Sequence, residues 1–193
     1  GDDSITVSTN DIASVSGGEG IDDVTLTDAS GNTVDLAGVE VITGSAGDDT
    51  LTVTDDTSVM VDGGDGADTL IGNAGDDTLL GGLGSDTLIG GGGADVVDGG
   101  QDDDLLELDG SVGVTAEGGD GRDTVVLVGE TNEASLSGVE VVVGSAGDDS
   151  VTVSTNDIEA ISGGDGIDDV TLTDASGNTV DLAGVEVITG SAG

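Results

Sequence analysis

The sequence predicts an all-β fold: a parallel β-roll, or β-solenoid, with about 18 residues per coil and turns stacked along two edges. Two observations predict it. The stretch from Gly63 to Glu107 repeats with a fixed period of nine residues. Glycine supplies 38 of the 193 residues, whereas Phe, Tyr and Trp are absent. A core without aromatic side chains is unusual in a globular domain, but it suits a narrow column of Val, Leu and Ile between glycine-rich turns.

The repeat of residues 63–107 consists of five consecutive units, GGDGADTLI, GNAGDDTLL, GGLGSDTLI, GGGGADVVD and GGQDDDLLE. Glycine opens each unit, aspartate holds the sixth place and an aliphatic residue holds the eighth. Glycine permits tight turns and aliphatic or β-branched residues favour strands, so each unit should form a six-residue turn and a three-residue strand. Two units then close one coil, with the eighth-place side chains inside and the ninth-place Ile71, Leu80 and Ile89 outside.

The sixth-place aspartates are the candidate ligands of a metal ion. Carboxylate and carbonyl oxygens are the hard ligands that calcium prefers, at about 2.3–2.6 Å. The chain has no Cys or His, so it lacks the soft ligands that favour zinc, copper or iron. Partners on one edge should lie one coil apart. The seven predicted pairs are Asp3 with Asp22, Asp49 with Asp68, Asp68 with Asp86, Asp86 with Asp104, Asp104 with Asp123, Asp77 with Asp95, and Asp149 with Asp168.

The units resemble the nonapeptide of the RTX, or haemolysin-type calcium-binding, repeat family, whose pattern is G-G-x-G-x-D-x-hydrophobic-x. The resemblance implies a calcium-loaded β-roll, here with about seven ions, as found in bacterial RTX adhesins, S-layer and fibre proteins. It also implies that carbonyls of the glycine places complete each ligand shell. In the tandem block these are Gly64, Gly66, Gly75, Gly82, Gly84, Gly91 and Gly93. The fifth unit departs from the pattern, because Asp102 stands where the second-half glycine is expected.

A longer repeat lies above the nonapeptide. Residues 1–47 and 147–193 differ at only five positions, and their offset of 146 residues corresponds to eight coils. We therefore expect residues 1–193 to form one continuous β-roll that is a window of a longer tandem array. Some half-coils lack the glycine–aspartate turn, so residues 26–43 and 172–189 could instead form hairpins. The coil interpretation is favoured because the intervals on both sides stay near multiples of nine.

The charge of the chain limits its partners. Its 42 acidic residues and single basic residue give a formal net charge of −41. Such a chain should repel nucleic acid and anionic membranes and attract cations. Arg122 is expected to pair with Asp120, to replace part of a calcium's role, or to be solvated. Met60 is expected in the core, and acids beside the ligands, such as Asp48 and Asp148, are expected to be solvated.

Catalysis is not expected from this chain. His, Cys, Lys and Tyr are absent, and carboxylate pairs lack the aromatic surface on which glycosidases hold sugars. We expect a calcium-dependent extracellular structural protein, secreted or at the cell surface, that forms a stiff rod in a fibre, S-layer or adhesin stalk. Its partners would be calcium and copies of itself joined end to end, without insertion into a membrane. The alternative is an RTX secretion and folding module attached to a toxin or enzyme.

Overall fold

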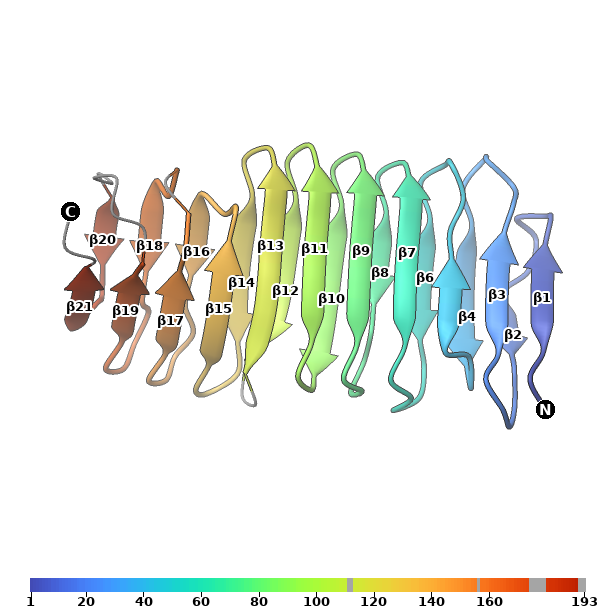
Figure 1. The fold of residues 1–193 in the computed structure, drawn as a ribbon, viewed down its shortest axis with the longest axis horizontal. Helices are drawn as coiled ribbons and strands as arrows, with labels where there is room; N and C mark the ends of the chain where they lie inside the picture. Colours follow the sequence, from blue (N-terminus) through green and yellow to red (C-terminus); the bar gives the residue numbers. More distant parts are fainter. Residues whose placement is uncertain (111–112, 156, 174–179, 191–193) are drawn as a thin grey trace.

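The chain forms a parallel β-roll, which confirms the predicted fold class. The computed structural model describes residues 1–110, 113–155, 157–173 and 180–190. Within these ranges all regular elements are strands, and every strand pairing is parallel. Successive strands alternate between two facing sheets, so the chain advances along one long axis from β1 to β21 (Figure 1). None of the described residues forms a helix long and apolar enough to span a membrane.

The two sheets are named by their strand numbers. The odd sheet contains β1 (Ser4–Val7), β3 (Asp23–Leu26), β5 (Val41–Thr43), β7 (Met60–Asp65), β9 (Thr78–Leu83), β11 (Val96–Gln101), β13 (Val114–Asp120), β15 (Glu133–Ser137), β17 (Ser150–Val153), β19 (Asp169–Leu172) and β21 (Val187–Gly190). The even sheet contains β2 (Ser14–Ser16), β4 (Thr33–Ala37), β6 (Thr50–Val53), β8 (Thr69–Ile71), β10 (Thr87–Gly92), β12 (Leu105–Asp109), β14 (Thr124–Val128), β16 (Val141–Val143), β18 (Ala160–Ser162) and β20 (Asp181–Ala183).

The strand register sets the length of each coil. In the tandem block, Met60 pairs with Thr78 and Thr78 pairs with Val96, so the step is 18 residues. Elsewhere the step varies: Thr33 pairs with Thr50, a step of 17, and Ser14 pairs with Asp35, a step of 21. The turns differ in length and account for this variation in step. The strands from β3 to β19 keep one side inward and the other outward.

The core is a single column of aliphatic side chains between the two sheets. The eighth-place residues are almost completely buried, with exposed fractions of 0 or 1%. These residues are Leu70, Leu79, Leu88, Val97 and Leu106. The prediction for Met60 is wrong: it begins β7 with its side chain 45% exposed, because its neighbours Val59 and Val61 take the inward positions.

The half-coils without a glycine–aspartate turn also wind as coils. β3 and β4 lie in different sheets, and β4 pairs in parallel with β2 and β6, so residues 26–43 do not form a hairpin. At the second copy, β20 pairs with β18 and β21 pairs with β19, while residues 174–179 lie outside the described part. Strands β1 and β17, which carry the copied sequence, lie eight steps apart in the odd sheet.

Candidate metal centres

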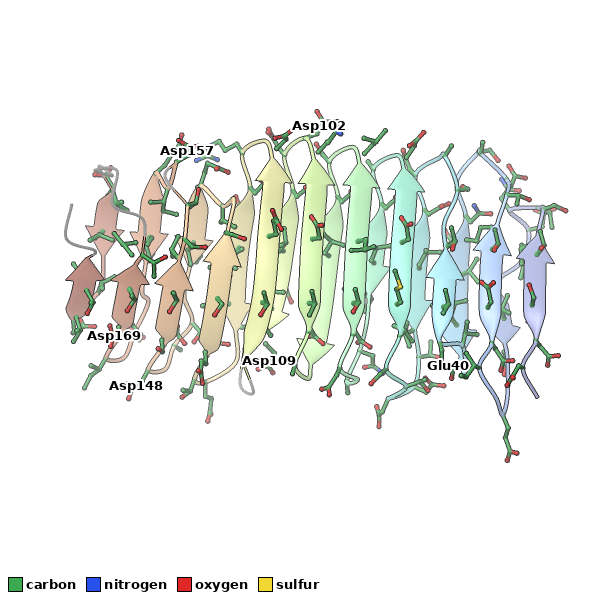
Figure 2. The ribbon with its side chains drawn as sticks, viewed as in Figure 1. Glu40, Asp102, Asp109, Asp148, Asp157 and Asp169 are labelled. Atoms are coloured by element: carbon green, nitrogen blue, oxygen red, sulfur yellow. The ribbon has the colours of Figure 1, made fainter. Side chains whose placement is uncertain are left out.

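The turns stack along two edges of the roll. The lower edge, as oriented in Figure 1, holds the turns that lead into the odd sheet, and the upper edge holds those that lead into the even sheet. Acidic side chains line both edges: in Figure 2, Glu40 and Asp148 lie at the lower edge and Asp102 at the upper. Ten sixth-place aspartates, each directly before a strand, are at most 4% exposed. They are Asp22, Asp49, Asp68, Asp77, Asp86, Asp95, Asp104, Asp123, Asp149 and Asp168.

These aspartates form a ladder along each edge. The main-chain N–H of Asp68 donates to Oδ1 of Asp86 over 2.8 Å, and the N–H of Asp86 donates to Oδ1 of Asp104 over the same distance. The structure thus places one carboxylate per coil against the coil before it. The same bond joins all seven predicted pairs, at 2.7–3.0 Å. Asp3 takes part only through its N–H, since its side chain is exposed.

Eight of the ten buried carboxylates have a second oxygen without a hydrogen-bond partner. This Oδ2 atom is buried at Asp22, Asp68, Asp77, Asp86, Asp95, Asp104, Asp123 and Asp168. We call a turn that ends in such a carboxylate an open corner. In each, Oδ2 faces the first glycine of its own unit; a Cβ on Gly81, for example, would lie 2.4 Å from Oδ2 of Asp86. A buried anionic oxygen without a partner is costly, so the corner suits a bound cation.

Burial raises pKa values along the tandem block. It raises the pKa of Asp68 and Asp104 to about 7, and that of Asp77 and Asp86 to about 6. The negative charge of neighbouring carboxylates adds to the effect of burial at Asp68, because Asp86 and Asp49 lie on the adjacent coils. The pKa values of Asp95, Asp123 and Asp168 are also raised by burial. The ionised ladder therefore lacks a compensating positive charge of its own.

The glycine places bring main-chain carbonyls into the same turns. A Cβ on Gly82 would lie 2.1 Å from the carbonyl oxygen of Gly64 on the preceding coil. A Cβ on Gly84 would lie at the same distance from the carbonyl oxygen of Gly66. Gly75 likewise places its carbonyl under Gly93. Among the described residues no three acidic side chains form a metal-binding group. Further ligands at an open corner would therefore have to be carbonyl oxygens, which fits the chemistry of calcium.

Two side chains replace glycine within these turns. Asn73 and Asp102 have φ angles of +81° and +73°, the left-handed conformation that the neighbouring units reach with glycine. Asn and Asp tolerate this conformation better than other side chains. The fifth unit therefore keeps the turn geometry in spite of its departure from the glycine pattern, and Asp104 remains an open corner.

Sequence reasoning did not foresee two features of the ladder, an open carboxylate without an aspartate partner on the preceding coil and a second kind of acceptor. Oδ1 of Asp77 accepts from the N–H of Val59, so this corner has no aspartate on the coil below. At three further steps of the ladder the acceptor is a glutamate. The N–H groups of Asp22, Asp123 and Asp168 donate to the Oε2 atoms of Glu40, Glu140 and Glu186, respectively. The recurring Gly-Val-Glu-Val, at the three corresponding positions in the sequence, was the available signal.

The exposed acids beside the ladder have a structural role. Asp48 accepts from the N–H of Ala67, and Asp148 accepts from the N–H of Ile167, each one coil further on. They therefore form an outer row of acceptors and are not merely solvated. The pairing expected between Arg122 and Asp120 is not found: Nε of Arg122 contacts Oε2 of Glu159 at 3.0 Å, with both side chains 56% exposed.

The geometry defines a parallel β-roll with open carboxylate corners along its edges, and comparison with known families agrees with this fold. The RTX calcium-binding nonapeptide repeat matches the chain in four copies, over residues 36–56, 60–88 and 71–106. The chain therefore contains RTX calcium-binding repeats and is a calcium-binding repeat protein. The searches of curated proteins and of solved structures found no match.

Proposed function

We propose that the chain is a calcium-dependent extracellular rod, the repeating part of a fibre, S-layer or adhesin stalk. The observation that carries the proposal is the position of the two sequence copies. The strands β1 and β17 lie in the same sheet, eight steps apart, so a further 146-residue copy would extend the roll without changing its face or edge. Repetition of the sequence then lengthens the rod and adds no new shape.

Calcium has a structural role in this proposal. The later aspartate of each of the seven predicted pairs is an open carboxylate, and Asp77, the earlier partner of Asp95, is the eighth. We assign these oxygens as calcium ligands, together with carbonyls of the glycine places. A net charge of −41 opposes the close stacking of coils, and bound divalent cations would offset that repulsion where the carboxylates are buried.

The length of engineered arrays tests the rod. Parallel strands lie about 4.8 Å apart, so eight coils advance the axis by roughly 38 Å. Arrays with one, two and three copies of residues 1–146 should give particles whose contour length grows by that increment in calcium, as seen by electron microscopy. Compact particles of constant length would contradict the rod and favour the role of a secretion and folding module.

A further inference from the structure

Two of the ten buried carboxylates differ from the rest. Both oxygens of Asp49 and of Asp149 have hydrogen-bond partners, whereas the other eight each leave Oδ2 unpaired. The two aspartates lie 100 residues apart and on opposite edges, since Asp49 precedes a strand of the even sheet and Asp149 a strand of the odd sheet. The same difference therefore arises twice in separate surroundings.

One asparagine and one serine satisfy each of these carboxylates. Oδ1 of Asp49 accepts from the main-chain N–H and from Nδ2 of Asn32, at 2.6 and 2.7 Å. Oδ2 accepts from the N–H of Ser45 at 2.7 Å and from its Oγ at 3.0 Å. Four donors thus surround one buried carboxylate, and an ionised carboxylate in such surroundings needs no cation.

The second copy of this cluster repeats the four contacts to the carboxylate. Oδ1 of Asp149 accepts from the N–H and Nδ2 of Asn132, at 3.0 and 2.7 Å. Oδ2 accepts from the N–H and Oγ of Ser145, at 2.8 and 3.1 Å. The asparagine also donates to the serine in both clusters, at 3.1 and 3.0 Å, which fixes the two side chains relative to each other.

The second place of each turn separates the two kinds of corner. All eight open corners have a left-handed residue there: Gly18, Gly64, Asn73, Gly82, Gly91, Gly100, Gly119 and Gly164. Ser45 and Ser145 occupy the same place without a positive φ, and their N–H groups point to the carboxylate four residues later. A serine at this place therefore supplies the two donors that the open corners lack.

We propose that the turns 44–49 and 144–149 are closed corners, in which serine and asparagine take the place of calcium. Asp49 and Asp149 then position the coil and do not bind metal. Each closed corner lies on the coil that precedes an open corner: Asp49 precedes Asp68, and Asp149 precedes Asp168. Each closed corner therefore marks the start of a calcium-binding stack. The inference rests on the proposed role of the open carboxylates as calcium ligands.

Two matched double variants of the full chain test the proposal. Asp49→Asn with Asp149→Asn changes the closed corners, and Asp68→Asn with Asp168→Asn changes the open corner one coil further on each edge. Each double variant removes two negative charges, with one carboxylate lost at each edge. Calcium bound per chain is measured by metal analysis after gel filtration in excess calcium. We expect the first variant to keep the native number of ions and the second to lose two.

The outcomes separate this inference from the assignment on which it rests. Equal losses of bound calcium in both variants would contradict the closed corners but would leave the ligand role of the open carboxylates intact. A native number of ions in the second variant would overturn the ligand role of the open carboxylates, and the inference with it.

A third variant, Ser45→Gly with Ser145→Gly, keeps every carboxylate and serves if the first does not fold. It removes both serine hydroxyls and permits the left-handed turn, so we expect a higher calcium requirement for folding and up to two additional ions. An unchanged calcium midpoint and ion count in this variant would contradict the proposal.

Discussion

The main-chain N–H of Asp86 donates to Oδ1 of Asp104, 18 residues later, over 2.8 Å. The carboxylate of Asp86 in turn accepts from the N–H of Asp68 on the coil below. Each such aspartate therefore uses one oxygen to hold the previous coil in register and keeps the other oxygen open. One oxygen of the carboxylate thus serves the main chain, and the other remains a buried anionic atom without a partner.

Replacement of Asp86 should weaken calcium binding in the middle of the upper-edge stack. Asp86→Ala removes the open oxygen and leaves the N–H of Asp68 without its acceptor. We expect the calcium midpoint of folding to rise about tenfold, which corresponds to about 1.4 kcal/mol. A calcium titration followed by circular dichroism measures it. Asp56→Ala, at an exposed acid, is the control, and equal midpoints for the two variants would refute the prediction.

Replacement of Asp48 by alanine should have a measurable effect on stability. The sequence predicts that this exposed acid is only solvated, but Asp48 accepts from the N–H of Ala67. We expect a small loss of stability, within the range of about 0.5–1.5 kcal/mol for a hydrogen bond, with no loss of bound calcium.

Removal of calcium should unfold the chain. With a net charge of −41 and buried carboxylates that lack partners, the coils should separate in excess EGTA. Extracellular calcium modules commonly bind at about 10⁻⁴–10⁻³ M, so millimolar calcium should restore the β spectrum in circular dichroism. Magnesium at equal concentration is the control and should fail, because it prefers a smaller octahedral shell. A β spectrum that persists in EGTA would rule this out.

The raised pKa values predict that protons and calcium compete. Burial raises the pKa of Asp68 and Asp104 to about 7 in the folded chain, against about 3.9 for an unfolded aspartate. The stabilisation from their protonated forms is complete below pH 4 and is lost as the pH rises through 7. Calcium-free chain should therefore show more β structure at pH 5 than at pH 8.

The same competition should weaken calcium binding in acid. The calcium midpoint of folding should be higher at pH 5.5 than at pH 8, because the ligands must first release protons. Asp68→Asn combined with Asp104→Asn should reduce this pH dependence, since it removes the two groups with pKa values near 7. The same calcium midpoint at both pH values would contradict the competition.

Glycine should be required at the second place of the open corner that ends in Asp86. Gly82 has a φ of +113°, and a Cβ there would lie 2.1 Å from the carbonyl oxygen of Gly64. Gly82→Ala should therefore lower the free energy of unfolding in calcium by about 2 kcal/mol or more, through backbone strain and the clash. Gly92→Ala is the matched control, because nothing lies within 4 Å of its Cβ. Equal free energies of unfolding for Gly82→Ala and Gly92→Ala, measured with denaturant, would contradict this prediction.

The sequence predicts most of the roll because its period and its chemistry agree. The fixed spacing of nine places Leu70, Leu79 and Leu88 in the core, and it also places the predicted aspartate pairs on common edges. Met60 was misplaced because its turn has no glycine pattern to set the phase of the strand. Only the observed register shows that Val59 and Val61 face inward.

The finer division of the corners was beyond the nonapeptide pattern. Asp49 and Asp68 both stand at a sixth place, and nothing in that place distinguishes them. The difference depends on Ser45, whose main-chain conformation decides where its N–H points, and on Asn32, which comes from the coil below. Side-chain contacts between coils and a local φ angle cannot be derived from spacing alone.

The aspartate ladder gives the rod a direction. Within the ladder of sixth-place aspartates the donor belongs to the earlier coil and the acceptor to the later one, whereas the outer row runs the other way, from the N–H of Ala67 back to Asp48. A break between two coils would thus expose ladder amides on the earlier coil and ladder carboxylates on the later one. Two identical ends brought together would set ladder amide against ladder amide or ladder carboxylate against ladder carboxylate. If the rod extends by association of its ends, as proposed, the ladder therefore favours head-to-tail stacking over closed two-fold pairs formed through the ends.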